Sequence, residues 1–345
     1  MVKVGINGFG IMGRGLFRAI NNDVRKSLLG ESEVEIMAIN DIFPVEQLAP
    51  LLRHDSIYGN FGGSVEADNE NLVVNGKKIA YSMEREPSKL RWGERGVDVV
   101  YESSGVFASK PGVEGHLSAG AKKVVISSPS DFAKKTIVMG VNDKEYNGEN
   151  IISNASCTTN CLAPLALALY DSFGPYEGLM TTVHAYTQDQ RLQDSPHKDI
   201  ARAYAAGLNI VPTFTGAAKA IGEVIPKLKS ELDGKVRLDG IAVRVPVAVG
   251  SLVDLVVNFD KADFSREHVN NVLRLVSDGY LKGAFKYEDG PLVSSMILGE
   301  RTPSVVDGSQ TRVIGKTLKV MSWYDNVMGY SYQAVRLIRK LGERL

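Results

Sequence analysis

The first third of the chain alternates short apolar runs of strand length with segments whose apolar residues recur at helical spacing. Within 12–20, for example, Met12, Leu16, Phe17 and Ile20 share one helical face. Such an alternation predicts a parallel sheet with helices on both faces. The predicted strands are 2–6, 34–39, 97–102 and 123–126, and the predicted helices are 12–20, 45–52 and 113–117.

A turn signal lies within this region at Asn75-Gly76, between two short apolar runs in residues 72–81. An Asn-Gly pair flanked by apolar runs is the strongest short-range sequence signal for a β-hairpin. We therefore expect a hairpin here.

After about residue 150 the strands become longer and the helical segments are grouped apart from them. This change predicts a second, α+β domain on a mixed or antiparallel sheet. We expect a doubly wound, Rossmann-type first domain over 1–156, completed by a helix in 326–345, and a second domain over 157–325. The predicted elements of the second part are strands 178–185, 238–249 and 252–259 and helices 216–225, 264–276 and 331–345.

The composition narrows the class of protein. The chain has 345 residues, with 40 Lys and Arg against 40 Asp and Glu, so its formal net charge is zero. This balance gives no electrostatic reason to expect nucleic acid or an anionic membrane as a partner. The two cysteines cannot cross-link so long a chain, and no apolar run reaches the roughly 20 residues of a membrane span. We expect a reduced, cytoplasmic protein.

A glycine motif directly follows the first predicted strand and opens the first predicted helix. Gly8, Gly10 and Gly13 form G-x-G-x-x-G. In this context the glycines allow a tight turn, close approach to a pyrophosphate and close helix–strand packing. The motif therefore predicts a dinucleotide site at the N-terminus of that helix.

Such a site also needs an acidic residue after the second strand, and Asp41 follows the run 34–39. Its distance from Gly13 exceeds the usual spacing of about 20 residues, and the polar stretch 21–33 can absorb the excess as a longer connection. A carboxylate there accepts hydrogen bonds from a ribose and repels a 2′-phosphate, which favours NAD over NADP. A strand-end cap or turn residue is the alternative.

The block Ser153–Cys161 contains both cysteines and precedes an apolar helical pattern. Cys157 is expected at a helix N-terminus, where the helix dipole and free N–H groups lower a thiol pKa. Cys161, one turn further on, is expected to be a small buried residue. No cysteines remain to complete a thiolate metal site.

A thiolate nucleophile needs a base, and His184, late in a predicted strand, is the best-placed histidine. An imidazole beside a thiolate can hold it as an ion pair and move a proton to or from the substrate oxygen. A structural role is the alternative. The other histidines lie in polar contexts and are expected at the surface: His54, His116, His197 and His268.

These segments resemble phosphorylating glyceraldehyde-3-phosphate dehydrogenase in register over nearly the whole chain. The segments concerned are 7–10, 153–161, 184–187, 215–219 and 323–326. The resemblance implies an NAD-binding first domain and a catalytic second domain. It implies that Cys157 attacks the aldehyde of glyceraldehyde 3-phosphate, that His184 takes the hydroxyl proton, and that inorganic phosphate releases the acyl group. It also implies a homotetramer, because 188–208 match a loop that lines a neighbouring subunit's cofactor site.

The resemblance further assigns binding residues. The cofactor residues it implies are Gly8, Gly10, Ile11, Met12, Gly13, Asp41, Arg85, Ser127, Asn326 and Tyr330. The substrate-phosphate residues are Thr187, Asp189, Arg202 and Arg244, and the inorganic-phosphate residues are Ser156, Thr158, Thr215 and Gly216. Among these, Arg244 lies inside an apolar run, where an unpaired guanidinium is costly. An anion partner or a snorkelling edge-strand residue would each account for it.

The chain departs from the family pattern at several places. Ile11 stands where the family usually has Arg, Val327 stands where it has an acid, and 227–239 is longer than usual. Ser195 stands where many NAD-specific relatives have Leu or Gly, so use of NADP stays open. The alternatives are erythrose-4-phosphate dehydrogenase, which hydrolyses its intermediate, and a non-catalytic nucleotide-binding relative.

Overall fold

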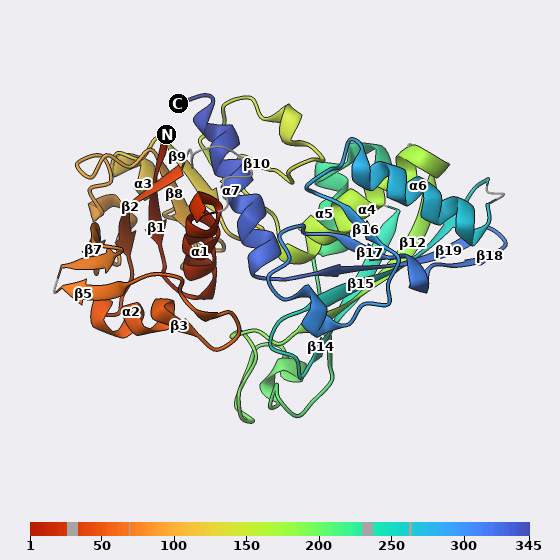
Figure 1. The fold of residues 1–345 in the computed structure, drawn as a ribbon, viewed down its shortest axis with the longest axis horizontal. Helices are drawn as coiled ribbons and strands as arrows, with labels where there is room; N and C mark the ends of the chain where they lie inside the picture. Colours follow the sequence, from red (N-terminus) through yellow and green to blue (C-terminus); the bar gives the residue numbers. More distant parts are fainter. Residues whose placement is uncertain (26–33, 69, 230–236, 262–263) are drawn as a thin grey trace. The chain divides into compact units, whose positions relative to one another are not determined.

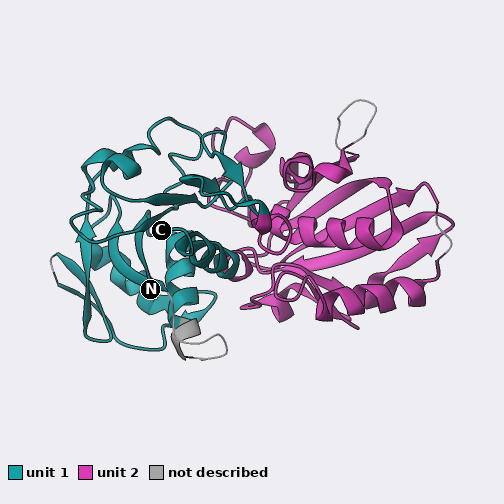
Figure 2. Ribbon diagram, turned by 90° about the horizontal axis from the view of Figure 1, so that it is seen from above, with its two compact units in different colours: residues 1–137, 145–155, 331–345 teal, residues 138–144, 156–330 magenta. Residues whose placement is uncertain are grey.

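The computed structural model describes residues 1–25, 34–68, 70–229, 237–261 and 264–345. The connection 21–33 and the long segment 227–239, both singled out in the sequence, lie largely outside these residues. The chain forms two compact units (Figure 2). Unit 1 comprises 1–137, 145–155 and 331–345, and unit 2 comprises 138–144 and 156–330.

Unit 1 contains a nine-stranded sheet in the order β10-β11-β9-β8-β1-β2-β7-β6-β5 (Figure 1). All pairs from β10 to β7 are parallel, and β6 is antiparallel to both its neighbours. The doubly wound class predicted from the sequence is confirmed. The strands are β1 (Val2–Asn7), β2 (Val34–Asn40), β5 (Val65–Asp68), β6 (Asn71–Val74), β7 (Lys77–Ser82), β8 (Val99–Glu102), β9 (Lys123–Ile126), β10 (Lys135–Thr136) and β11 (Ile151–Ser153).

The hairpin prediction is also confirmed, because β6 and β7 are joined by Asn75 and Gly76 with φ of 52° and 78°. Both angles are those of a type I′ turn, which is why Asn-Gly suits it. Beyond the large sheet, β3 (His54–Asp55) pairs with β4 (Gly59–Asn60). The helices of this part are α1 (Ile11–Arg25), α2 (Val45–Arg53), η1 (Pro87–Lys89) and α3 (Gly115–Ser118).

Unit 2 contains an eight-stranded mixed sheet in the order β13-β14-β12-β15-β19-β17-β16, with β18 paired to β19. The β12–β14 and β16–β17 pairs are parallel and the others antiparallel. This confirms the predicted mixed sheet. The strands are β12 (Tyr176–Ala185), β13 (Val211–Phe214), β14 (Leu238–Val245), β15 (Ser251–Phe259), β16 (Lys286–Glu288), β17 (Val305–Asp307), β18 (Arg312–Ile314) and β19 (Thr317–Tyr324).

One strand prediction needs correction, and one central strand of this sheet was not predicted. The run 238–249 is strand only to Val245, because Pro246 supplies no N–H and a turn follows in which Val247 N donates to Val245 O at 2.7 Å. Strand β19, which pairs with β15, β17 and β18, was not predicted at all.

Helices α4, α5 and α6 cover the sheet of unit 2 (Figures 1 and 2). Helix α4 is buried on every side from residue 158 to residue 169, as expected of an apolar helix at the centre of a domain. Strand β15 alternates buried and more exposed residues, so the opposite face of this sheet remains open. The helices are α4 (Cys157–Phe173), α5 (Ala217–Val224), α6 (Arg266–Asp278), η3 (Ile200–Ala203), η4 (Pro226–Leu228), η5 (Ser294–Ile297) and η6 (Gly308–Gln310), with η2 (Asp143–Glu145) and α7 (Met328–Gly342) crossing unit borders.

Candidate active site

The glycine motif forms the turn between β1 and α1. Gly8 has a φ of +90°, and a Cβ there would lie 2.5 Å from the backbone nitrogen of Ser104. A Cβ on Gly13 would lie 2.2 Å from the Gly8 carbonyl oxygen, whereas one on Gly10 would meet nothing within 4 Å. The turn therefore leaves no room for a side chain at Gly8 and Gly13, is open at Gly10, and leads directly into α1. It fits a pyrophosphate, which needs close backbone approach at such a terminus.

Asp41 follows β2 and lies beside this turn. Its Oδ2 accepts a hydrogen bond from Phe9 N at 2.6 Å, and its Oδ1 accepts from Ile42 N at 2.7 Å and Phe43 N at 3.2 Å. The carboxylate therefore does what the turn interpretation expected. It also lies at the carboxyl edge of the parallel sheet, where a ribose would be bound.

The other cofactor residues named by the resemblance lie in both units. Ile11 and Met12 are the first residues of α1, and Ser127 directly follows β9. Arg85 is exposed, and its backbone N–H donates to Glu84 Oε1 at 2.7 Å. Asn326 and Tyr330 belong to unit 2. The Asn326 Oδ1 accepts hydrogen bonds from Gly250 N and Ser251 Oγ, while Tyr330 is buried.

Cys157 is the first residue of α4, as predicted. The helix is capped by Ser156, whose Oγ accepts a hydrogen bond from Thr159 N at 2.9 Å. The Cys157 Sγ lies 3.4 Å from His184 Nε2. The structure therefore brings the predicted nucleophile and the predicted base into contact.

Burial and neighbouring charges act in opposite directions on the Cys157 thiol. Burial raises the pKa of the Cys157 thiol, although the Arg244 charge and hydrogen bonds from Thr158 act to lower it. Burial and Arg244 lower the pKa of His184 to about 3. Burial thus opposes the thiolate that the helix terminus, Arg244 and the hydrogen bonds from Thr158 favour. Burial likewise favours the neutral imidazole of His184.

His184 and Arg244 are cross-strand partners in the parallel pair β12–β14. The Arg244 Nη1 lies 2.5 Å from His184 Nδ1 and donates to Ala185 O at 3.1 Å, and the same Nδ1 lies 2.6 Å from that oxygen. With the proton on Nδ1, that atom and Arg244 Nη1 both donate to Ala185 O and Nε2 is the acceptor for the thiol proton; with Nδ1 unprotonated, it accepts from Arg244 and Nε2 carries the proton. Among the described residues nothing accepts from the buried Arg244 Nε.

Tyr324, at the end of β19, contacts both Thr158 and His184, and the sequence analysis assigned it no role. Its hydroxyl lies 2.9 Å from Thr158 Oγ1 and 2.8 Å from Thr182 Oγ1, and its ring packs edge-on to His184 with centroids 5.9 Å apart. Thr158, expected at the inorganic-phosphate site, therefore turns its hydroxyl into the protein. Its backbone N–H is what it could offer an anion. The sequence signal for this strand is the alternation of side chains along 317–324, in which every second residue is buried.

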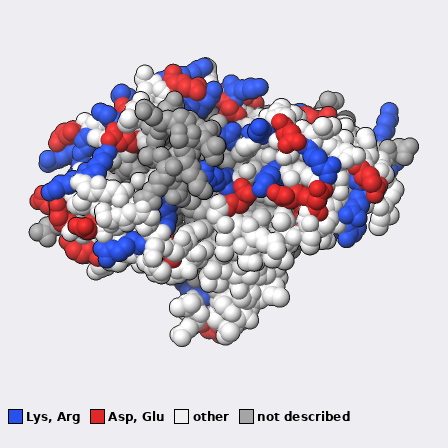
Figure 3. Space-filling model, in the orientation of Figure 1, with Lys and Arg blue, Asp and Glu red and all other residues white. Residues whose placement is uncertain are grey.

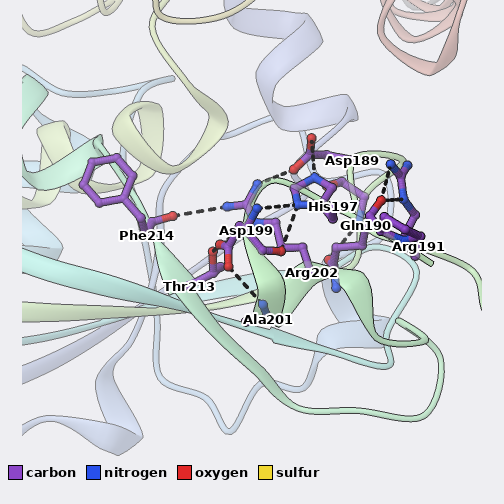
Figure 4. A network of polar contacts seen from close by, with 11 residues as sticks. Asp189, Gln190, Arg191, His197, Asp199, Ala201, Arg202, Thr213 and Phe214 are labelled. Carbon is purple, nitrogen blue, oxygen red and sulfur yellow. Dashed lines mark hydrogen bonds and ion pairs between the residues drawn. The ribbon is translucent and has the colours of Figure 1, made fainter. Parts of the chain in front are cut away.

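The loop after β12 contains a polar network around Arg202 (Figure 4). Arg202 forms an ion pair with Asp189, donates from Nε to Thr213 Oγ1 at 2.9 Å and from Nη2 to Phe214 O at 3.3 Å. Burial acts to raise the pKa of Asp189, but Arg202 and His197 lower it overall. Asp189 therefore pairs with an arginine, as its negative charge favours. Arg202 makes more hydrogen bonds and ion pairs within the protein than Arg244 does.

The remaining phosphate candidates lie at element ends. Thr187 follows β12, and Thr215 and Gly216 precede α5, where Thr215 Oγ1 accepts from Ala217 N at 3.2 Å. Such ends offer backbone N–H groups to an anion.

The prediction of surface histidines is wrong at His116, which is fully buried in unit 1. Trp92 Nε1 donates to its Nδ1 at 3.0 Å, and its Nε2 lies 2.9 Å from Glu102 Oε2. The His197 side chain is also largely buried, within the Arg202 network. His54 and His268 are exposed as expected.

The residues that the structure describes contain no cluster of three or more His, Cys, Asp and Glu that could hold a metal ion. None of the helices in that part of the chain combines the length and apolarity needed to cross a bilayer.

A glycine turn at the start of α1 in unit 1, and a pair formed by Cys157 of α4 and His184 of β12 in unit 2, are what an oxidoreductase with a dinucleotide cofactor and a covalent step requires. Residues 2–110 match the NAD binding domain of glyceraldehyde 3-phosphate dehydrogenase, and residues 156–326 match its C-terminal domain. Glyceraldehyde-3-phosphate dehydrogenase of Mycobacterium avium is 50% identical over 347 residues, covering 100% of this chain and 99% of the relative.

Glyceraldehyde-3-phosphate dehydrogenase 1 of Bacillus subtilis is 48% identical over 346 residues, covering 99% of each chain. The chain therefore belongs to the glyceraldehyde-3-phosphate dehydrogenase family. It is an oxidoreductase with an NAD-binding domain.

Proposed function

We propose that the chain oxidises and phosphorylates glyceraldehyde 3-phosphate to 1,3-bisphosphoglycerate with NAD, using Cys157 as nucleophile and His184 as acid–base group. The observation that carries this proposal is the 3.4 Å contact between Cys157 Sγ and His184 Nε2 at the start of α4. It occurs in a chain that matches both domains of the family.

In the first step the Cys157 sulfur attacks the aldehyde carbon. The thiol proton passes to His184 Nε2 and from there to the new alkoxide, which gives a thiohemiacetal. The backbone N–H of Cys157 and the His184 side chain stabilise the developing oxyanion. A neutral imidazole suits this step, because an imidazolium could not accept the thiol proton.

In the second step His184 removes the hydroxyl proton of the thiohemiacetal as the carbon loses hydride. NAD, when bound, accepts that hydride. The carbonyl reforms as a thioester on Cys157. Inorganic phosphate then attacks the thioester carbon, the carbon–sulfur bond breaks, and the thiolate leaves and regains its proton from His184.

Arg244 is the principal anion-binding side chain in this proposal. Its buried Nε has no acceptor within the described residues, so a phosphate oxygen would satisfy it. Thr187 is proposed beside it at the substrate phosphate, while Arg202, paired with Asp189, contributes one face of its guanidinium. Inorganic phosphate is assigned to Ser156, to the backbone of Thr158, and to Thr215 and Gly216.

The proposed cofactor contacts use the cradle and its neighbours. Gly8, Gly10 and Gly13 with the N–H groups of Ile11 and Met12 hold the pyrophosphate. Asp41 accepts from the ribose, which favours NAD over NADP. The remaining contacts proposed are Arg85, Ser127, Asn326 and Tyr330.

A homotetramer in the cytoplasm completes the proposal, and two apolar surfaces support the tetramer. The loop after β12 exposes Leu192 and Leu208, at 86% and 85%, with further apolar side chains. The loop forms the lower lobe of Figure 1, which carries little charge in Figure 3. The open sheet face exposes Leu179, Ile241 and Val256. Two self-complementary interfaces are what a dihedral tetramer requires. Sedimentation should give dimers for Leu192→Asp and for Leu179→Asp.

The test of the activity is NADH formation from glyceraldehyde 3-phosphate with and without inorganic phosphate. We expect phosphate-dependent turnover that Cys157→Ser abolishes. Phosphate-independent turnover with a preference for erythrose 4-phosphate would instead identify a hydrolytic relative. No turnover together with NAD binding would identify a non-catalytic one. Replacing NAD by NADP in the same assay measures the cofactor preference.

A further inference from the structure

A row of buried polar side chains crosses the carboxyl ends of neighbouring strands in unit 1. Glu102, Asn7 and Asn40 are cross-strand partners on β8, β1 and β2, and each is buried. Asn7 Nδ2 donates to Glu102 Oε2 at 2.5 Å, and Asn40 Nδ2 donates to Asn7 Oδ1 at 2.7 Å. Both amides donate toward Glu102, so the hydrogen bonds along the row all run in one direction. We call these three residues the polar ladder.

His116 holds the acidic end of the polar ladder. Trp92 Nε1 donates to His116 Nδ1 at 3.0 Å. An indole nitrogen only donates, so Nδ1 must accept, and Nε2 carries the proton that it donates to Glu102 at 2.9 Å. Trp92 is itself fixed, because its ring packs on Gly5 of β1, where a Cβ would lie 2.8 Å from it.

The other end of the polar ladder reaches the segment after β7. Asn40 Oδ1 accepts from Glu84 N at 2.9 Å, and Asn40 Nδ2 donates to Glu84 O at 2.8 Å. Asp41 directly follows Asn40, and Arg85 directly follows Glu84. The ladder therefore sets the backbone from which both proposed cofactor side chains project.

The Glu102 carboxylate also supports the glycine turn. Its Oε1 accepts from Ser104 N at 2.8 Å and from Ser104 Oγ at 2.5 Å. Ser104 N is the atom that a Cβ on Gly8 would approach to 2.5 Å. The neighbouring Ser103 Oγ donates to the Gly8 carbonyl at 2.7 Å. The carboxylate thus fixes the wall against which the turn is packed.

Four hydrogen bonds reach this carboxylate, two on each oxygen. A buried charge is tolerated only when it is hydrogen-bonded, and a half-satisfied network is costly. All four donors must therefore stay in place together. The consequence is that the glycine turn, Asp41 and Arg85 keep one relative arrangement.

We propose that the polar ladder and His116 are positioning residues for NAD: they touch none of the cofactor but hold the three segments that do. This inference rests on the NAD-binding function. It adds residues on β1, β2 and β8, and His116 outside the matched 2–110 range, to the determinants of cofactor affinity.

Glu102→Gln tests the proposal, because its amide presents two protons to donors whichever way it turns. We expect the Kd for NAD to rise about tenfold or more. At saturating NAD kcat should stay within about twofold, because the ladder does not contact the reacting groups. The matched control is Val124→Ala, a fully buried truncation on β9 of the same sheet. It should lower the melting temperature with the Kd within about twofold.

An unchanged Kd in Glu102→Gln, or an equal rise in Val124→Ala, would overturn the proposal. If Glu102→Gln does not fold, Trp92→Phe decides: it keeps an aromatic ring but removes the donor that fixes the His116 tautomer. There we expect a rise in Kd of about two- to fivefold at unchanged kcat, and no rise would refute the positioning role. Wild-type enzyme that failed to bind NAD would refute the proposed function instead.

Discussion

Replacing Arg244 by methionine should raise the pKa of both partners in the reactive pair. A positive charge favours loss of a proton, and the guanidinium lies 2.5 Å from the His184 ring while also acting on Cys157. Methionine keeps a long side chain but removes that charge. In the variant, therefore, the thiol should ionise at higher pH and the imidazole should be protonated at higher pH.

The size of the effect follows from the charge separation. Two unit charges about 4 Å apart interact by about 4 kcal/mol at an effective dielectric constant of about 20. The pKa of His184 falls from 6.5 to about 3, and burial is the larger cause. The Arg244 contribution is the second cause of this shift, so about 4 kcal/mol is an upper bound on it.

Alkylation of Cys157 by iodoacetamide across pH measures this directly, because the thiolate is the reacting form. Wild-type rates should still be rising above pH 9, since the thiol pKa is raised. Below the midpoint of the wild-type curve of rate against pH, Cys157 of the Arg244→Met variant should react about tenfold slower or more. Arg202→Met is the matched control: its charge is paired with Asp189, so the rate should change much less. A wild-type rate that levels off near pH 6–7 would refute the reasoning.

Three further predictions concern the cradle, the buried imidazole and the second cysteine. Gly13→Ala should destabilise the protein by about 1–3 kcal/mol because its Cβ would meet a carbonyl oxygen, whereas Gly10→Ala should stay stable and bind NAD more weakly; thermal unfolding and NAD titration distinguish them. Between pH 6.5 and about 3 the unfolded chain binds a proton at His184 that the folded chain does not, so this residue's stabilisation falls by about 2 kcal/mol from pH 7 to pH 5. In the His184→Asn variant, denaturant unfolding should show a loss of stability from pH 7 to pH 5 that is about 2 kcal/mol smaller than in the wild type. Burial raises the pKa of Cys161 to about 12, so Cys161 should stay unreactive and Cys161→Ala should leave the alkylation rate of Cys157 unchanged, as measured by peptide mass mapping.

The elements that the sequence predicted correctly are those whose structure depends on the local sequence. The Asn75-Gly76 turn, the glycine turn after β1 and the helix start at Cys157 each follow from a few adjacent residues. Strand β19 was missed because its buried positions include Ser322 and Tyr324, so the alternation is weak in hydrophobicity. Its place in the sheet depends on pairing with β15, a distant part of the chain.

The burial of individual side chains could not be predicted from the sequence. Cys157 at a helix terminus suggests a low thiol pKa, but the surroundings that desolvate it come from β12, β14 and β19. His116 looked like a surface residue because its neighbours in the chain are polar. Trp92 and Glu102, far from it in sequence, enclose it.

Both units place their functional side chains by the register of parallel strands. His184 and Arg244 are direct partners on β12 and β14, and the polar ladder joins direct partners on β8, β1 and β2. A slip of one residue would turn either set to the opposite face, since side chains alternate along a strand. The residues of the proposed catalytic pair and of the polar ladder can be found one at a time in the sequence. Their contact depends on strand pairing that spans 60 residues at Arg244 and His184 and 95 at Asn7 and Glu102.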